Sequence, residues 1–395
     1  MPNKRMVELG EKRSVIRDLF EYGCARKKIV GADKVYDFSI GNPSIPAPEA
    51  VNKALVELIE NTEPTALHGY SSAAGDPAVR KAVADNINSR FGQHITPNEI
   101  YMTCGAAASL TISLNALLNE GDEVIVFAPF FPEYAVFIEK AGGKLVSVRA
   151  QKPDFAPDLD ELRAKITQKT RAVIVNSPNN PSGAVIGRET LRAICAILKE
   201  RSEEYGAPIF IIADEPYREL VYGDVEVPYV MNEYKNTLVC YSYSKSLSLP
   251  GERIGYIAVC PDAENKDKIF AAVCGAGRAL GYVCAPVLFQ KILLSCVGEK
   301  ANVAAYEKNR DMLYGALCSM GYTCVAPQGA FYLFIEAPGG DDNAFCEMAK
   351  KHDLLLVPSS SFGLPGYMRI AYCVSPETIE RALPAFKALA EECRL

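Results

Sequence analysis

The chain has 395 residues, 49% of them hydrophobic, and a formal net charge of −6 at pH 7. That length suits one large α/β domain with a smaller partner, and the composition can fill a sizeable core. The charges are mixed and no long basic run is present, so neither nucleic acid nor an anionic membrane surface is indicated as a partner. The longest apolar runs, such as "PIFIIA", are too short to span a bilayer.

The N-terminal segment "MPNKRMVELGEKRSV" is charged and has no apolar signal-peptide core. The 13 cysteines are scattered and form no C-x-x-C pair, so reduced thiols in the cytoplasm are the expected state. Only three histidines occur, His68, His94 and His352, and they lie far apart in sequence. The sequence therefore predicts neither a histidine-rich metal site nor a histidine-based nucleophile relay.

The first 35 or so residues read as a charged arm that carries one amphipathic helix around residues 14–29, "SVIRDLFEYGCARKKI". The next segment, "IGNPSIPAP" at residues 40–48, contains one glycine and three prolines, which exclude a helix. From about residue 99, short apolar runs alternate with helical stretches. These runs are "EIYMTC", "EVIVFA", "KLVSVRA", "AVIVNSP", "PIFIIAD" and "TLVCYSYS".

Strands separated by helices predict an α/β fold, with a mostly parallel sheet covered by helices on both faces. Beyond residue 296 the pattern is a long helix, a strand ("AFYLFIEAP"), a helix, a strand ("MRIAYC") and a final helix. This indicates a second, smaller α/β domain built with the N-terminal arm. The predicted division is therefore 1–45 for the arm, 46–296 for the large domain and 297–395 for the small C-terminal domain.

In a parallel sheet, ligands bind beyond the carboxyl ends of the strands, so the residues that follow each apolar run are of interest. The first run is followed by "GAAAS", small residues that open a helix and leave backbone N–H groups free to bind an anion. Asn180 follows another run, in the turn "NNPSG". Each feature alone also fits an ordinary tight turn.

Asp214 ends six apolar residues, which places its carboxylate at the sheet rim in need of a cationic partner or of a helix to cap. Tyr217 is expected on the same face of a helix starting there. Lys245 follows "TLVCYSYS", and Arg253 comes eight residues later in "GERIGY". Taken singly, these two are more often a solvated loop lysine and a surface ion-pair residue.

The stretch "GAGRALG" at residues 275–281 is not read as a dinucleotide-binding loop. Its glycine spacing is wrong, and the residues before it have a helical rather than a strand pattern.

Together, the sheet rim would present an anion cradle, an amide, a carboxylate, a phenol, an amine among hydroxyls and a guanidinium. A pyridine aldehyde phosphate needs this set: donors for its phosphate, a carboxylate for its ring nitrogen, donors for its ring oxygen and a lysine for its aldehyde. With these motifs, "NSPNNPSG", "DEPY" and "SYSKSLSLPGERIGY" in order, the chain resembles a class I pyridoxal-phosphate-dependent aminotransferase of the aspartate-aminotransferase-like superfamily. The resemblance runs from "SVIRDLFEYG" to "MRIAY".

The resemblance implies a role for each residue at the cofactor ring. Lys245 matches the Schiff-base lysine that also shuttles the proton, and Asp214 matches the partner of the ring nitrogen. Asn180 and Tyr217 match the donors to the ring oxygen, and Asn180 also lies beside the substrate. Phe131, in "APFFPEY", matches the aromatic residue that stacks on the ring, where many relatives have tryptophan.

The phosphate site implied by the resemblance consists of Ser242, Arg253 and the backbone at Gly105, Ala106 and Ala107. Ala107 stands where many relatives have a hydroxyl or a longer polar side chain, so one donor is lost.

The substrate and dimer contacts are implied in the same way. Arg369, in "MRIAY", matches the arginine that grips the substrate α-carboxylate, and Gly41, in "IGNP", matches a backbone position against that carboxylate. Tyr70 matches a tyrosine that reaches across a homodimer to the neighbouring subunit's phosphate.

The resemblance implies ping-pong transfer of an amino group between an L-amino acid and a 2-oxo acid, with aspartate and 2-oxoglutarate as one candidate pair. Two alternatives stay open from sequence: a carbon–sulfur β-lyase on the same fold, and a non-catalytic pyridoxal-binding sensor. The sensor would need a DNA-binding module, for which no basic helix–turn–helix pattern is visible. A dicarboxylate substrate would need a second cation, for which Arg278 is a candidate that equally fits an exposed helix arginine.

Overall fold

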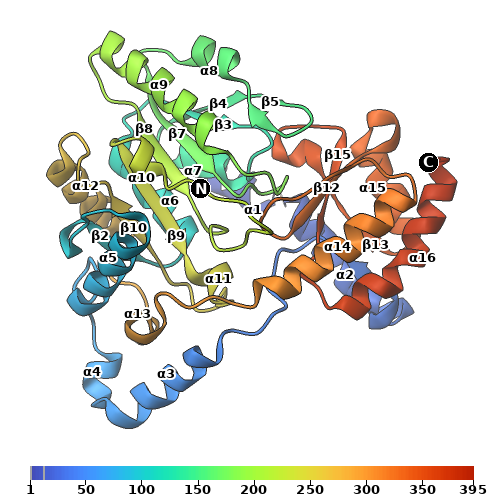
Figure 1. Ribbon diagram of the computed structural model, residues 1–395, viewed down its shortest axis with the longest axis horizontal. Coiled ribbons are helices and arrows are strands. Elements are labelled where there is room, and N and C mark those ends of the chain that lie inside the picture. Colours follow the sequence, from blue (N-terminus) through green and yellow to red (C-terminus); the bar gives the residue numbers. More distant parts are fainter. Residues whose placement is uncertain (1, 12–13) are drawn as a thin grey trace.

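The computed structural model describes residues 2–11 and 14–395 and consists of two α/β layers side by side (Figure 1). Met1, Lys12 and Arg13, which belong to the predicted N-terminal arm, lie outside the described residues. The large layer contains a seven-stranded sheet and the small layer a four-stranded one. The predicted fold class is confirmed.

The large sheet is parallel except at one strand. Its spatial order is β2 (Ile100–Thr103), β10 (Gly255–Val259), β9 (Thr237–Ser242), β8 (Phe210–Asp214), β7 (Thr170–Asn176), β3 (Glu123–Phe127) and β4 (Lys144–Val148). The six predicted strands are confirmed, but β10, which runs antiparallel to both of its neighbours, was not predicted. Five of the strands are buried along most of their length, as expected where helices cover both faces.

Helices cover the two faces according to the direction of each crossover. One face carries α6 (Ala106–Leu117), α7 (Glu133–Lys140) and α12 (Lys266–Ala279); the other carries α8 (Leu159–Lys165), α9 (Arg188–Tyr205) and α10 (Val230–Glu233). Connections that move along the sheet in opposite directions place their helices on opposite faces when every crossover is right-handed. The parallel strands all end at the same edge of the sheet. At this edge β9 leads into the short helix α11 (Tyr243–Ser246).

The small layer is an antiparallel sheet wrapped by long helices. Its strands are, in order, β11 (Cys324–Val325), β12 (Tyr332–Glu336), β15 (Tyr367–Ala371) and β14 (Val357–Pro358). Its helices are α2 (Val15–Val30), α14 (Val303–Ser319), α15 (Asp342–Lys351) and α16 (Pro376–Cys393). The N-terminal segment joins this layer because β1 (Tyr36–Asp37) pairs in parallel with β13 (Leu354–Leu355).

The remaining elements extend the two layers. They are α1 (Lys4–Glu11), α3 (Glu49–Asn61), α4 (Pro64–His68), α5 (Pro77–Phe91) and α13 (Val287–Cys296), with the hairpin β5 (Ala150–Gln151) and β6 (Ala156–Pro157). Helices α3 and α4 pack on α13 and project from the large layer at the bottom of Figure 1. None of the helices in the described ranges is long and apolar enough to cross a bilayer.

Local sequence signals account for many helix ends. Asp76 caps α5 by accepting from the backbone N–H groups of Ala78 and Val79, and Gly92 ends the helix with φ 68°. An acidic N-cap and a left-handed glycine satisfy backbone groups that a helix leaves free at its ends.

Each layer has its own hydrophobic core. One draws its buried side chains from residues 51–296, the other from residues 19–38, 217–222 and 306–390. The exact domain boundaries stay a prediction. The second core includes Tyr217, so a loop of the large layer packs into the small one.

The residues after β8 differ from the prediction. No helix starts at Asp214; residues 216–219 form a turn instead. The backbone N–H of Glu215 bonds to Cys240, which prolongs the ladder, and Pro216 disfavours helical backbone at the residue before it. Tyr217 is thus positioned by a turn and by the second core, not by a helix face shared with Asp214.

Candidate active site

Most of the predicted site residues meet at the carboxyl edge of the large sheet. The neighbouring strands β9, β8 and β7 end at Ser242, Asp214 and Asn176. A cavity of about 100 Å³ at this edge is lined by six predicted residues. They are Ala106, Ala107, Phe131, Asn180, Asp214 and Tyr217.

Asp214 is a buried carboxylate with one oxygen left unpaired. Its Oδ2 accepts a hydrogen bond from the Tyr134 hydroxyl and a longer one, 3.4 Å, from Asn176 Nδ2. Its Oδ1 has no partner among the residues that the structure describes. Burial raises the pKa of Asp214 to about 7, the Tyr134 bond opposes that rise, and Glu215 adds to it. Such an oxygen suits a ligand that carries a protonated nitrogen.

Lys245 projects from the single turn α11. Its Nζ donates to the backbone oxygen of Gly41 at 2.6 Å and lies 5.2 Å from the centre of the Phe331 ring. Burial lowers the pKa of Lys245 to about 8, with smaller opposing and reinforcing effects from Cys373 and Arg253. A lysine of this kind is neutral, and so nucleophilic, in a useful fraction of molecules near neutral pH.

An anion cradle lies between the start of α6 and the loop after Lys245. Gly105 precedes α6 with φ 83°, and no side chain caps the helix. A Cβ at Gly105 would lie 2.9 Å from the guanidinium of Arg253, so glycine is required for the approach. Arg253 donates to the Ser244 hydroxyl at 3.3 Å, and Ser242 bonds to the same hydroxyl at 2.9 Å. Free backbone N–H groups, a guanidinium and two hydroxyls match the needs of a phosphate group.

Arg369 comes from β15 of the small layer and is 2% exposed. It donates to Asn180 Oδ1 at 3.1 Å and to the backbone oxygen of Ser39, while its Nε has no partner in the described structure. The guanidinium lies 4.7 Å from the Tyr332 ring centre and 5.0 Å from that of Phe362. A buried guanidinium with spare donors is prepared to bind a carboxylate.

Three predicted residues need separate mention. Gly41 packs directly against Tyr332, since a Cβ at Gly41 would lie 2.1 Å from the Tyr332 hydroxyl oxygen. Tyr70 lies apart from the cluster and is 91% exposed. Arg278 is exposed in the last turn of α12.

Four residues of the site were not predicted. Asn176 donates to the Asp214 backbone at 2.9 Å, and as a polar residue at the end of an apolar strand it carried a usable signal. Ser244 was one hydroxyl among several in its loop. Tyr134 and Tyr332 lie in "FFPEY" and "AFYLF", where an aromatic residue reads as core.

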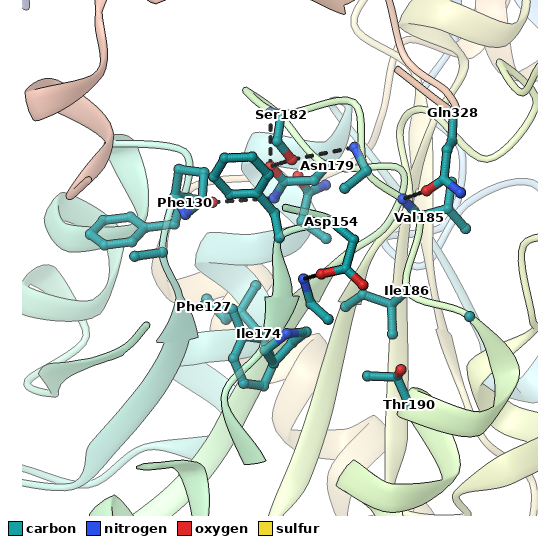
Figure 2. Close-up of a pocket in the computed structure, with 18 of the residues that line it drawn as sticks. Phe127, Phe130, Asp154, Ile174, Asn179, Ser182, Val185, Ile186, Thr190 and Gln328 are labelled. Carbon is teal, nitrogen blue, oxygen red and sulfur yellow. Dashed lines mark hydrogen bonds between the residues drawn. The ribbon is translucent and has the colours of Figure 1, made fainter. Parts of the chain in front are cut away.

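A second, larger cavity of about 240 Å³ lies beyond Tyr134 and Asn176 (Figure 2). Tyr134 and Asn176 line this cavity, and both bond to Asp214. The residues that line it include Phe127, Asp154 and Gln328, which Figure 2 labels, and none of the predicted catalytic residues. The two side chains therefore form a wall behind the Asp214 carboxylate.

Comparison with known proteins gives the family. The profile described as aminotransferase class I and II matches residues 33–386. The chain belongs to the class I and II aminotransferases. It is therefore a pyridoxal-phosphate-dependent transaminase acting on amino acids and 2-oxo acids.

Relatives of this aminotransferase agree along nearly the whole chain. A probable aspartate/prephenate aminotransferase of Aquifex aeolicus is 33% identical over 375 residues, 91% of each chain. A crystal structure of an aminotransferase from Eubacterium rectale is 53% identical with a TM-score of 0.98 and full coverage of both chains. The aspartate aminotransferase of Thermus thermophilus, solved with maleate, is 27% identical with a TM-score of 0.86 and covers 98% of this chain and 99% of its own.

The aminotransferase site fits its cofactor on the structure's own observations. The unpaired Oδ1 of Asp214 suits the protonated ring nitrogen, and the close approach of Gly105 and Arg253 forms a cradle for the phosphate. The lowered pKa of Lys245 suits an amine that must attack an aldehyde.

Replacing Tyr134 with phenylalanine should raise the pKa of Asp214 above about 7, because the hydrogen bond that opposes burial is lost. More of the carboxyl would then be neutral at pH 7 in the cofactor-free protein, so the acid limb of the pH profile for cofactor binding should move to higher pH. Losing one hydrogen bond to a charged group corresponds to a loss of about 10- to 100-fold in cofactor affinity at pH 7. Tyr229→Phe is the matched control, because the buried Tyr229 hydroxyl has no partner in the described structure. An unchanged profile in Y134F would show that Tyr134 only packs.

Proposed function

We propose that this aminotransferase transfers the amino group of L-aspartate to 2-oxoglutarate, with each predicted residue in the role described above. Lys245, Asp214 and Tyr217 would be the catalytic residues. The cofactor would be held by Asp214 at its ring nitrogen, by Asn180 and Tyr217 at its ring oxygen, and by Phe131 against its ring. Its phosphate would be held by the backbone of Gly105, Ala106 and Ala107, with Ser242 and Arg253.

The proposed chemistry depends on how the protein holds charges and protons. When bound, the cofactor supplies an electron-withdrawing ring that accepts the electron pair of the broken α-C–H bond. Asp214 keeps a proton on the ring nitrogen by holding a negative charge beside it in a buried setting. Arg369, with the backbone at Gly41, fixes the substrate carboxylate and so orients the α-carbon. Lys245, once its amine is free, removes the α-proton and returns it, for which a pKa of about 8 is suitable.

The observation that carries the proposal is the placing of Lys245 and Asp214 together with Arg369. A buried amine of lowered pKa, a buried carboxylate with an unpaired oxygen and a buried guanidinium with a spare donor converge from three elements. A structural ion pair would satisfy these groups, whereas here Asp214 Oδ1 and Arg369 Nε have no hydrogen-bond partner in the described structure and Lys245 is paired with no carboxylate there.

The test is an absorbance spectrum of the purified holoenzyme, taken before and after single amino acids are added without any 2-oxo acid. With aspartate, we expect the visible absorbance band of the lysine-bound cofactor to disappear and one molecule of 2-oxo acid to form per site. If the band disappears with another amino acid but not with aspartate, that amino acid is the donor and the proposed substrate is wrong. A persistent band with pyruvate released over many turnovers would indicate a β-lyase instead.

Replacing Arg369 with lysine should raise KM for the amino acid and for the 2-oxo acid together, because lysine cannot form the two parallel bonds of a guanidinium. Loss of one charged hydrogen bond corresponds to about 10- to 100-fold in KM, with a smaller change in kcat. Arg310→Lys is the control: Arg310 also lies over a ring, 4.6 Å from the centre of Tyr222, but outside the site. Equal KM values for R369K and the wild type would remove Arg369 from substrate binding.

We further propose a cytoplasmic homodimer in which Tyr70 crosses the interface. Four large apolar side chains on or near α3, α4 and α13 support the dimer by being strongly exposed: Val56 at 54%, Ile59 at 62%, Tyr70 at 91% and Val283 at 61%. Sedimentation equilibrium tests the dimer, and a monomer across the concentration range would exclude a crossing Tyr70. The two hydrophobic cores, apart from residues 217–222, support the predicted division at residues 45/46 and 296/297.

A further inference from the structure

Tyr332 lies between the groups that hold the two reactants. It comes from β12 of the small layer and is 3% exposed. Its hydroxyl lies 2.9 Å from the hydroxyl of Tyr217, and its ring lies 4.7 Å beneath the guanidinium of Arg369. Gly41 packs so closely on this hydroxyl that a Cβ there would lie 2.1 Å from the hydroxyl oxygen. Tyr332 therefore contacts both Tyr217, through its hydroxyl and ring, and Arg369, through its ring.

From this arrangement we infer that Tyr332 is a positioning residue that acts through Tyr217 on the cofactor and through its ring on Arg369. The inference rests on the proposed roles of Tyr217 and Arg369. Either hydroxyl of this pair can donate. With Tyr332 as the donor to the Tyr217 oxygen, the Tyr217 proton is left free to point at the cofactor ring oxygen. The edge-to-face packing of the two rings, at 5.7 Å and 78°, fixes that direction.

Two consequences follow when the Tyr332 hydroxyl donates a hydrogen bond to the Tyr217 hydroxyl, which itself donates to the cofactor. A phenol that accepts a hydrogen bond becomes a better donor itself, since bonds in a chain polarise one another. A stronger donor to the ring oxygen stabilises the form of the bound chromophore in which that oxygen carries more negative charge, which is the deprotonated form. Removing the Tyr332 hydroxyl should therefore raise the pH midpoint of the visible absorbance.

The experiment measures that midpoint in substrate-free holoenzyme for the wild type, Tyr332→Phe, Tyr217→Phe and the double variant. One neutral hydrogen bond corresponds to a rise of about 0.3 to 1 pH unit in Y332F. Because Tyr332 acts through Tyr217, the double variant should have the same midpoint as Y217F. An unchanged midpoint in Y332F, or equal shifts from Y332F in both backgrounds, would overturn the relay.

Tyr372→Phe is the matched control. Tyr372 is fully buried and its hydroxyl bonds to that of Tyr222 at 3.1 Å, so the same kind of phenol pair loses the same atom outside the site. Y372F should lower the thermal midpoint of the apoprotein without moving the absorbance midpoint. If Y372F moves the absorbance midpoint as far as Y332F does, the effect is a general loosening and the inference fails.

The ring of Tyr332 is tested separately with Tyr332→Leu and a non-reacting dicarboxylate, maleate. Loss of the ring beneath Arg369 should weaken maleate binding about 3- to 30-fold, while Y332F should bind it as the wild type does. Equal maleate affinity in Y332L and the wild type would remove Arg369 from the inference. If the wild type itself binds no cofactor, the proposed function fails; if it binds cofactor and transaminates while Y332F matches it, only the inference fails.

Discussion

Lys245→Ala should abolish turnover with every amino acid while leaving the apoprotein folded. Lys245 would both hold the cofactor and move the α-proton, and its buried amine has a lowered pKa suited to both tasks. General acid–base assistance alone corresponds to about 10²–10⁴-fold, and loss of the covalent link adds to it. The measurement is the single-turnover rate of ketoacid formation after reconstitution with cofactor.

The same substitution should stabilise the apoprotein below about pH 8. Burial lowers the pKa of Lys245 from 10.5 to about 8, so between these values the unfolded chain binds more protons than the folded one. Stability from this group therefore rises as pH increases from about 8 to 10.5 and is lost as pH falls through 8. At neutral pH the cost is on the order of 3 kcal/mol. Denaturant unfolding of wild-type and K245A apoprotein at pH 7 and pH 10.5 should show a gap that closes at the higher pH.

Lys291→Ala is the control for that comparison, since Lys291 is a partly buried lysine, with 19% of its side chain exposed, that pairs with Asp76 outside the site. K291A should keep its activity and gain no stability at pH 7. If K245A had the single-turnover rate of the wild type, Lys245 would have no part in the chemistry.

The sequence predicted the sheet through its apolar runs because these strands are central and buried, which gives short, unbroken hydrophobic segments. It missed β10, "GYIAV", although Pro250 and Gly251 mark a turn shortly before it. The direction of a strand within a sheet depends on partners far along the chain. It placed Tyr217 on a helix because three-residue spacing suggested one. Pro216 and the bond from Glu215 to Cys240 override that spacing.

The site was predictable where polar residues end a strand, as Asp214 does, or follow shortly after one, as Asn180 and Lys245 do. Tyr134 and Tyr332 were not, because each is a phenol in an aromatic segment whose hydroxyl finds its partner only after distant elements pack. Gly41 shows the same limit. Its resemblance to a carboxylate-binding position was visible, but its close contact with Tyr332 needs the small layer to fold against the N-terminal segment.

Asp214→Asn should reduce kcat/KM by about 10²–10³-fold or more, because an amide cannot hold a proton on the cofactor ring nitrogen. Removing a single preorganised electrostatic contact in a dry site has effects of this size. The amide has the shape of the carboxylate, so the contacts with Tyr134 and Asn176 remain geometrically available. The measurement is kcat/KM for aspartate with cofactor at saturation, together with the cofactor dissociation constant.

The same substitution, Asp214→Asn, should lower activity but increase the stability of the apoprotein. Burial raises the pKa of Asp214 from 3.8 to about 7, so the folded protein binds more protons than the unfolded chain between these values. The stability contributed by this group is full below pH 3.8 and is lost as pH rises through about 7. Above pH 7 the charged, half-satisfied carboxylate costs on the order of 4 kcal/mol, and D214N removes that cost. Unfolding at pH 8 should therefore find D214N apoprotein more stable than the wild type.

Asp342→Asn separates this effect from a general response to losing a buried carboxylate. Asp342 is equally buried but accepts hydrogen bonds from Ser360 and Ser359 in the small layer. Its amide variant should lose stability and keep its activity, the reverse of D214N. A buried carboxylate that destabilises the empty protein is retained because its unpaired oxygen is needed by the bound cofactor. If D214N were less stable than the wild type at pH 8, Asp214 would be a structural residue, and its free oxygen would not be evidence for a ligand.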